Sequence, residues 1–210
     1  MAIKGFDPDG RQAAAHRRRM EVLDAAVAEF ADHGWRGTTF EGVAQRSGSS
    51  VASVARVYTD KAGLLMAAFR RASFGDYDNL QAAYAGLRLH AGMSVDERLG
   101  TIADFVSGVM QRVAPLISPL QQAIAEDERI RELVEMARAR RLSTSQELVR
   151  IISRDGQPRG GAVEQVYVLT SGETYLQVVE ELHHPAEAYA DWLRSALDVA
   201  VNGRPVAAPD

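Results

Sequence analysis

Residues 38–61 read TTFEGVAQRSGSSVASVARVYTDK, and this stretch predicts two short helices joined by a tight turn. Thr38 and Glu41 have the Thr-x-x-Glu spacing of a capping box, in which two side chains satisfy free amides at a helix start. We therefore expect a first helix from about Thr39 to Arg46.

The second helix of the pair is expected from about Val51 to Val57, with Ser49 or Ser50 as its cap and Gly48 in the turn before it. Two short helices joined by a turn of about three to four residues form a helix-turn-helix unit, whose second helix fits the DNA major groove, about 12 Å wide. A helical hairpin in a core has the same pattern. Spacing alone therefore supports DNA binding and core packing about equally.

The first turn of the second helix carries only small side chains. Ser50 and Ser53 offer hydroxyls that can bond to bases or phosphates, while Val51 and Ala52 can touch a thymine methyl group. Small side chains also let the helix backbone come close to the bases.

A wider set of positions resembles the DNA-binding domain of the TetR (tetracycline-repressor-like) family, in register and without gaps over residues 17–69. The resemblance implies an all-α homodimer, in which an N-terminal three-helix helix-turn-helix domain binds DNA. A variable C-terminal helical domain would bind a small ligand, mediate dimerisation and so release the DNA. The matching residues are Leu23-Asp24-Ala25-Ala26, Phe30, His33-Gly34-Trp35, Thr38-Thr39-Phe40, Val43-Ala44, Gly48, Ser50, Ser53-Val54, Tyr58, Lys61 and Leu64-Leu65.

Candidate DNA contacts come from three segments: a basic cluster before the first helix, the hairpin, and the start of the helix that follows it. The basic cluster could instead be a solvated helix start, and Lys61 could be an ordinary surface lysine. The candidates are Arg17, Arg18, Thr39, Ser49, Ser50, Val51, Ala52, Ser53, Arg56, Tyr58 and Lys61.

The hairpin departs from the family pattern at several positions. Ala55 stands where the family usually has a phosphate-binding Tyr, Val57 where it commonly has His, and Ala52 where it has Gly or Pro. Arg56 or Tyr58 can replace the missing phosphate contact, whereas Glu41 would repel phosphate near the groove.

The predicted function is that of a ligand-responsive transcriptional regulator, most simply a repressor. The alternative is a dimeric ligand-binding or interaction module with weak or lost DNA binding.

The charge is distributed unevenly along the chain of 210 residues, whose net charge is −4. Residues 1–72 carry 11 Lys and Arg against 8 Asp and Glu. The rest carries 13 and 20 of the chain totals of 24 and 28, so a basic first third of +3 precedes an acidic body of −7. This asymmetry is expected where only the first third meets phosphate.

Apolar periodicity predicts helices throughout the remaining chain. The domain prediction is a flexible arm at 1–15, the DNA-binding domain at 16–60, a helical ligand-binding and dimerisation domain at 61–203, and a loose tail at 204–210. After the hairpin and its preceding helix at about 17–33, helices are expected at about 61–74 and 77–90. The next helix is capped by Ser94 and Glu97 and ends near Pro115, and another starts at Ser118-Pro119. A long helix follows from about 127, and the last two are expected at about 162–182, with an interruption near 170–172, and at about 185–201.

The second domain supplies candidates for an effector pocket and for a dimer interface. Each pocket candidate is by itself more often a core residue than a ligand contact. The effector expected is small and largely apolar. The pocket candidates are Tyr84, Phe105, Val106 and Met110, with Trp192 as a further one; the interface candidates, on the last two helices, are Tyr167, Tyr175, Trp192, Leu193 and Leu197.

Composition and motifs argue against other classes of protein. The chain has no Cys, which excludes disulfides and thiol catalysis. Its five His residues are scattered, and Ser171 lies outside any Gly-x-Ser-x-Gly elbow, so an enzyme is the least favoured class. No cofactor or metal is expected. No signal peptide and no membrane span are recognisable, and a cytoplasmic protein is the default expectation.

Overall fold

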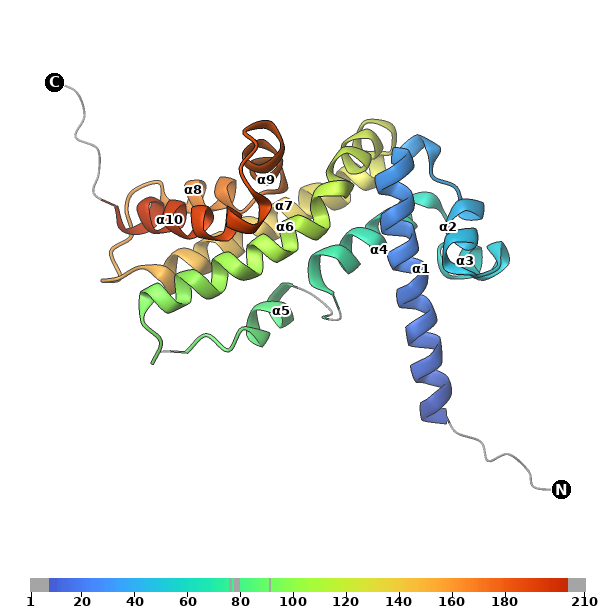
Figure 1. The fold of residues 1–210 in the computed structure, drawn as a ribbon, viewed down its shortest axis with the longest axis horizontal. Coiled ribbons are helices and arrows are strands. Elements are labelled where there is room, and N and C mark those ends of the chain that lie inside the picture. Colours follow the sequence, from blue (N-terminus) through green and yellow to red (C-terminus); the bar gives the residue numbers. More distant parts are fainter. Residues whose placement is uncertain (1–7, 76, 78–79, 91, 204–210) are drawn as a thin grey trace.

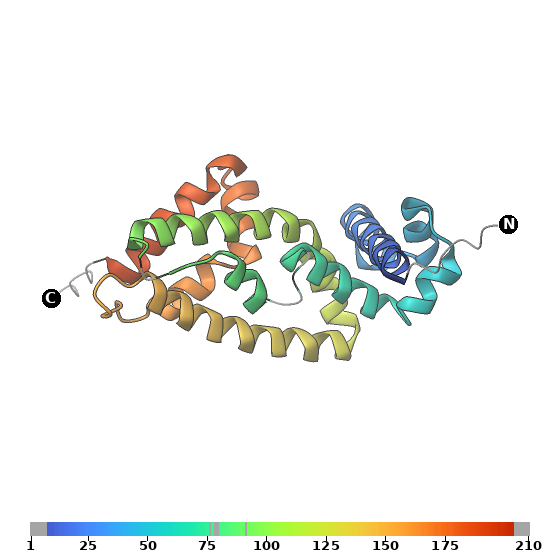
Figure 2. The same cartoon turned by 90° about the horizontal axis from the view of Figure 1, so that it is seen from below.

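The computed structural model describes residues 8–75, 77, 80–90 and 92–203, and within them every long element is a helix and none is a strand. The expectation of an all-α fold is confirmed. The molecule is elongated, with α1 to α4 at one end and α8 to α10 toward the other (Figure 1). A second view shows α6 and α7 running side by side along its length (Figure 2).

Four helices build the N-terminal end. The first begins well before the expected position, so residues 8–15 are helical and the prediction of a flexible arm there is wrong; residues 1–7 lie outside the described part. Gly34 interrupts this helix with a φ of 66°, as its expected end at His33-Gly34 predicts. The four helices are α1 (Pro8–Gly37), α2 (Phe40–Ser47), α3 (Val51–Val57) and α4 (Lys61–Phe74).

The cap of α2 differs from the predicted capping box. Thr39, not Thr38, is the N-cap, and its Oγ1 accepts a hydrogen bond from the Gly42 amide at 3.0 Å. The Thr38 hydroxyl is buried and donates to the Gly34 carbonyl at 2.7 Å. Either of two consecutive threonines can serve as the N-cap. Thr39 caps α2 because the hydroxyl of Thr38 is hydrogen-bonded to the end of α1.

The C-terminal part consists of two long helices and a group of shorter ones. The predicted Ser94–Glu97 capping box is present, with each side chain bonded to the other residue's amide. The predicted interruption near 170–172 separates α8 from α9. The helices are α5 (Leu80–Gly86), α6 (Val95–Glu126), α7 (Glu128–Ile152), α8 (Ala162–Leu169), α9 (Gly172–Leu176), the π-helix η1 (Gln177–Glu181), the 3₁₀-helix η2 (Ala186–Ala188) and α10 (Tyr189–Asn202). The predicted tail at 204–210 lies outside the described residues.

One helix, α6, runs through both Pro115 and Pro119, so the predicted end near Pro115 and restart at Ser118 are wrong. Each proline removes a backbone hydrogen bond and would normally end or kink a helix. Here the residues around Pro115 are buried, including Ala114 and Leu116. Burial of these apolar side chains outweighs the local propensity, because most helix stability in proteins comes from tertiary packing.

Two clusters of buried side chains form the core, and α6 contributes to both. The first joins α1 to α4 with the second half of α6, and the second joins the first half of α6 with α7, α8, α9 and α10. Phe105 and Met110 pack against both clusters. None of the described helices is both long and apolar enough to span a membrane. The two ends of the molecule are therefore connected through one continuous helix.

Candidate nucleic-acid interface

Helix α3 is held by one buried residue and exposes the others. Val54 is 1% exposed and packs in the first core cluster, whereas the other six side chains of the helix are exposed. Val51 and Val57 are 38% and 50% exposed. A short helix presented outward in this way is suited to entering a groove.

The start of α3 is capped as predicted. Ser50 Oγ accepts a hydrogen bond from the Ser53 amide at 3.1 Å, and the two hydroxyls lie 2.8 Å apart. Gly48, at the turn, has a φ of 65°, a left-handed conformation that glycine adopts without strain. Ser49 is half-buried and donates its amide to the Ala44 carbonyl at 2.9 Å. The hydroxyl of Ser53 thus has a fixed place on the exposed first turn.

Two candidate DNA contacts, Tyr58 and Lys61, make interactions within the chain itself. Tyr58 is 6% exposed, its hydroxyl oxygen is buried and it belongs to the first core cluster, so the prediction that it contacts DNA is wrong. Tyr58 follows Val54 by four residues, about one helical turn, so both side chains point to the same inner side. Lys61 donates from Nζ to the Trp35 carbonyl at 2.7 Å and lies 4.6 Å from the centre of the Trp35 ring.

The remaining basic candidates are exposed. Arg17 and Arg18 lie on the first turns of α1, a part of the helix that extends past α2 and α3 in Figure 1. Arg56 lies on the outer side of α3. Among the described residues none of these three guanidinium groups has an internal partner, which leaves them available to an anion. Thr39, at the start of α2, is also exposed.

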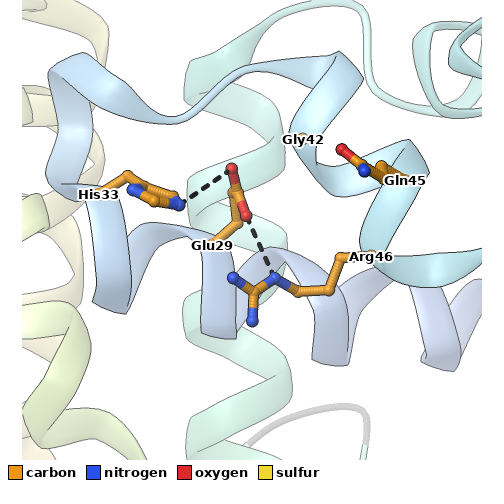
Figure 3. A pocket seen from close by; sticks show the side chains of 5 residues that line it. All are labelled: Glu29, His33, Gly42, Gln45 and Arg46. Atoms are coloured by element: carbon orange, nitrogen blue, oxygen red, sulfur yellow. Dashed lines mark hydrogen bonds and ion pairs between the residues drawn. The ribbon is translucent and has the colours of Figure 1, made fainter.

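A buried carboxylate supports the hairpin from behind, and the sequence analysis did not single it out. Glu29 of α1 is 6% exposed and accepts a hydrogen bond from Arg46 Nε of α2 at 3.1 Å; His33 Nε2 lies 3.7 Å from its other oxygen (Figure 3). Arg46 also donates to Asp32, which is the main cause that raises the pKa of the guanidinium. Glu29, His33 and Arg46 line a surface hollow of about 340 Å³ together with Gly42 and Gln45.

Gly42 is the sequence signal that could have revealed this contact. A Cβ atom at this position would lie 2.1 Å from Glu29 Oε1. Glycine inside a helix costs about 0.5–1 kcal/mol relative to alanine, so its presence in α2 indicates a close approach from a neighbouring group. The Glu29–Arg46 pair fixes α2 against α1 and hence sets the direction in which α3 projects.

The comparison with known families bears on this N-terminal part. A family model described as "Bacterial regulatory proteins, tetR family" matches residues 22–68, which include α2, α3, the second half of α1 and the first half of α4. The chain is a TetR-family transcriptional regulator. No curated protein sequence matches the chain.

Solved structures share the fold over most of the TetR-family chain, beyond the N-terminal part. A TetR-like regulator from Rhodococcus sp. RHA1 is 21% identical, with a TM-score of 0.58 over 87% of this chain and 94% of that one. A putative transcriptional regulator from Pseudomonas aeruginosa PAO1 is 14% identical, with a TM-score of 0.60 over 92% and 91%. NalD of Pseudomonas aeruginosa, the secondary repressor of a multidrug efflux pump, is 17% identical, with a TM-score of 0.59 over 89% and 97%. At these identities the likeness concerns the fold alone.

The pocket candidates of the TetR-family chain gather on α5 and α6. The rings of Tyr84 and Phe105 are 5.0 Å apart, and burial raises the pKa of the Tyr84 hydroxyl. Val106 is 3% exposed, and Met110 is half-buried. Trp192 lies elsewhere, with its ring 5.3 Å from that of Tyr189. The first four residues remain candidates for a pocket wall.

Several interface candidates belong to the chain's own core. Leu193 and Leu197 are fully buried, and Tyr175 is 6% exposed against the ring of Tyr189, so a second chain cannot reach their side chains and the prediction for them is wrong. The periodic apolar face of α10 serves the second core cluster rather than a partner. Tyr167 and Trp192 are half-buried, and Tyr167 stacks under the Arg141 guanidinium at 3.8 Å.

Proposed function

We propose that this TetR-family transcriptional regulator binds a palindromic DNA operator as a homodimer, represses transcription there, and is released by a small, largely apolar effector. Its place of action would be the bacterial cytoplasm. The observation that carries the proposal is the outward presentation of α3, which is anchored by Val54 and exposes its six other side chains. A dimer would place two such helices in successive major grooves, roughly 34–36 Å apart.

The chemistry of the exposed face supports contact with DNA. Arg56 can bind a guanine edge or a phosphate, Ser53 can donate or accept at either, and Val51 can pack against a thymine methyl. Arg17 and Arg18 are placed on an extension of α1, where they can add phosphate or minor-groove contacts. Arg56 and Ser53 carry most of the polar chemistry of the exposed face.

The dimer would form through the outer faces of α8 and α10. These helices pack against each other, and they expose Val168 and Val199 to 57% and 60%. Two such pairs from two chains can build a four-helix interface about a two-fold axis. Tyr167 and Trp192, both half-buried, stay candidates for its margin.

The effector would bind along α5 and α6, where Tyr84, Phe105, Val106 and Met110 provide aromatic and apolar surface. A ligand that prefers one spacing of the two α3 helices shifts the population toward it, with a coupling of about 1–3 kcal/mol. Linkage is reciprocal, so DNA would weaken effector binding by the same factor.

Selection of DNA from a random library by the full chain, followed by titration of the enriched duplex, tests the proposal. We expect a salt-dependent complex of two chains per palindrome, weakened about 5- to 100-fold by Arg56→Ala and less by Ser53→Ala. The control is Arg138→Ala, which removes an exposed charge of α7. Binding that neither α3 variant weakens would refute the assignment of α3 as the recognition helix.

The alternative, a dimeric module without useful DNA affinity, is favoured by two exposed residues. Ala55 offers no phosphate contact, and Glu41 lies on the first turn of α2 with its carboxylate exposed. The same selection decides between the two functions, because the alternative predicts no enriched sequence at any salt concentration.

A further inference from the structure

The last part of α1, after the break at Gly34, is held by the end of α6. Trp35 donates its amide to Gln122 Oε1 at 3.2 Å and its indole Nε1 to Glu126 Oε2 at 3.0 Å. Arg36 Nε donates to the other oxygen, Glu126 Oε1, at 2.6 Å, and this pair is the main cause that lowers the pKa of Glu126. Each carboxylate oxygen of Glu126 thus holds one residue of the segment that precedes the helix-turn-helix.

The segment that follows the helix-turn-helix is held by the start of α7. Asp60 caps α4 by accepting a hydrogen bond from the Gly63 amide at 2.8 Å, and it also accepts one from Arg129 Nη1 at 3.0 Å. Both bonds lower the pKa of Asp60. Lys61, the next residue, donates to the Trp35 carbonyl, so the two flanking segments are also tied to each other.

These contacts place both ends of the helix-turn-helix on one corner of the C-terminal domain. The corner is the junction of α6 and α7, with Gln122, Glu126 and Arg129 as its contacting residues. With a single contact the helix-turn-helix could rotate about that contact relative to the C-terminal domain. Contacts both before α2 and after α3 resist this rotation. Apolar packing of α1 and α4 against α6 also holds the two parts together, and Arg112 Nε of α6 donates to the Ala72 carbonyl of α4 at 2.9 Å. The bonds at the corner are those that lie directly beside the helix-turn-helix.

Helix α6 connects this corner to the proposed effector region. Its 32 residues extend over roughly 48 Å at 1.5 Å per residue, and Phe105 and Met110 on the same helix pack against both core clusters. A shift of α6 at its middle would therefore move the corner and, with it, both flanks of the helix-turn-helix.

We infer that Glu126 and Arg129 are positioning residues, which set the orientation of the helix-turn-helix relative to the C-terminal domain. The inference rests on the proposed DNA binding for its consequence in function, but the positioning itself is a property of one chain. It assigns the transmission of an effector signal to the α6–α7 corner.

The test uses the absence of cysteine in the full chain. Cysteines introduced at the exposed positions Glu41, on α2, and Asp104, on α6, accept spin labels, and an excess of unlabelled chain keeps one labelled chain per dimer. Double electron–electron resonance then measures the distance distribution between the two labels. We expect one narrow distribution for the parent and a broader or shifted one for Glu126→Gln, because the amide keeps only one of the two acceptor oxygens.

Arg129→Ala provides a second variant on the other flank, and Glu132→Gln, an exposed carboxyl of α7, is the matched control. The thermal midpoint and helical content of each variant show that it is folded. An unchanged distribution in both corner variants overturns the inference. Since this measurement contains no DNA, it distinguishes failure of the positioning role from failure of DNA binding.

A second readout uses the DNA selected by the parent chain. We expect Glu126→Gln to weaken binding about 5-fold and to tolerate one added base pair between half-sites better than the parent does. A variant that is only destabilised would lose affinity for both spacings alike, and such a loss overturns the positioning role.

Discussion

Two surfaces of this chain expose valine side chains, and they differ in the charge of the domain around them. The reading face of α3 (Val51, Ala52, Ser53, Ala55, Arg56 and Val57) lies in the first third of the chain, which has a net charge of +3. The outer face of α8 and α10 (Val168 and Val199) belongs to the body, with a net charge of −7. Under the proposed function both are contact surfaces, and the charge indicates which of them can approach a phosphate backbone.

The length of the elements separates the two surfaces as well. Helix α3 has seven residues with mostly small side chains, too little to bury the roughly 800 Å² per partner of a standard protein interface. Helices α8 and α10 have eight and fourteen residues and pack against each other, which gives a broader face. The comparison thus supports the proposal that the first surface contacts DNA and the other contacts a second chain.

The largest effect is expected when a charge is placed on each surface in turn. Val199→Asp should raise the dimer dissociation constant at least about 30-fold, because an unpaired carboxylate would be buried at a cost of about 2 kcal/mol or more. Val57→Asp should leave the dimer intact and weaken DNA binding by repelling phosphate. Light scattering and DNA titration measure the two effects; a Val199→Asp protein that stays dimeric at low concentration would break the comparison.

The next effect concerns the support behind the reading face. Gly42→Ala should lower the free energy of unfolding by about 1–3 kcal/mol, because the added Cβ displaces the buried Glu29 carboxylate from Arg46. Gly100→Ala, in α6, is the matched control, since a Cβ there meets no atom within 4 Å and alanine should stabilise the helix by about 0.5–1 kcal/mol. Urea unfolding of both variants tests the opposite signs. Equal effects would mean that Glu29 contributes nothing to the packing of α2 on α1.

A smaller effect sharpens the account of what the reading face recognises. Replacing thymine by uracil in the selected DNA removes one methyl group. We expect the DNA affinity to fall about 4-fold for each methyl that Val51 or Ala52 covers, because each buried carbon contributes about 0.8 kcal/mol. Val51→Ala should reduce this dependence at one position only. If no position responds to deoxyuridine, recognition depends on Arg56 and Ser53 rather than on the apolar side chains.

The smallest effect is a pH dependence at the corner between the two regions. Folding lowers the pKa of Asp60 and of Glu126 from the ordinary values of 3.8 and 4.5, so their contributions are complete above these values and are lost as the pH falls through the lowered ones. We expect stability to decline on acidification below pH 4, and less so in Glu126→Gln. An identical acid profile in the variant would show that the Glu126 carboxylate adds no stability.

Local patterns predicted the elements whose signals are local. The Ser94–Glu97 capping box and the Ser50 cap of α3 formed as expected, because each depends on side chains and amides within one turn of helix. The choice of Thr39 over Thr38 as the cap of α2 was not predictable, since the Thr38 hydroxyl is taken by the Gly34 carbonyl in the same turn between helices.

The candidate site was predicted in part for the same reason. Spacing indicated α3 and its exposed residues, but Tyr58 proved to belong to the core, as did Leu193 and Leu197 of the expected dimer interface. A periodic apolar face shows that a helix has a buried side; it does not tell whether its own chain or a second one covers that side. The Glu29–Arg46 pair joins residues 17 positions apart, and only Gly42 hinted at it.

By itself the sequence determined the helical class, the hairpin at 38–61 and the family of its N-terminal domain, because capping, glycine turns and apolar periodicity act over a few residues. Only the tertiary structure decided that α6 passes through two prolines and that the junction of α6 and α7 holds both flanks of the helix-turn-helix. Those outcomes depend on which distant surfaces meet, as Glu126 meets Trp35 across 91 positions of the chain. Burial at such contacts outweighs local preference, and no short stretch of sequence records it.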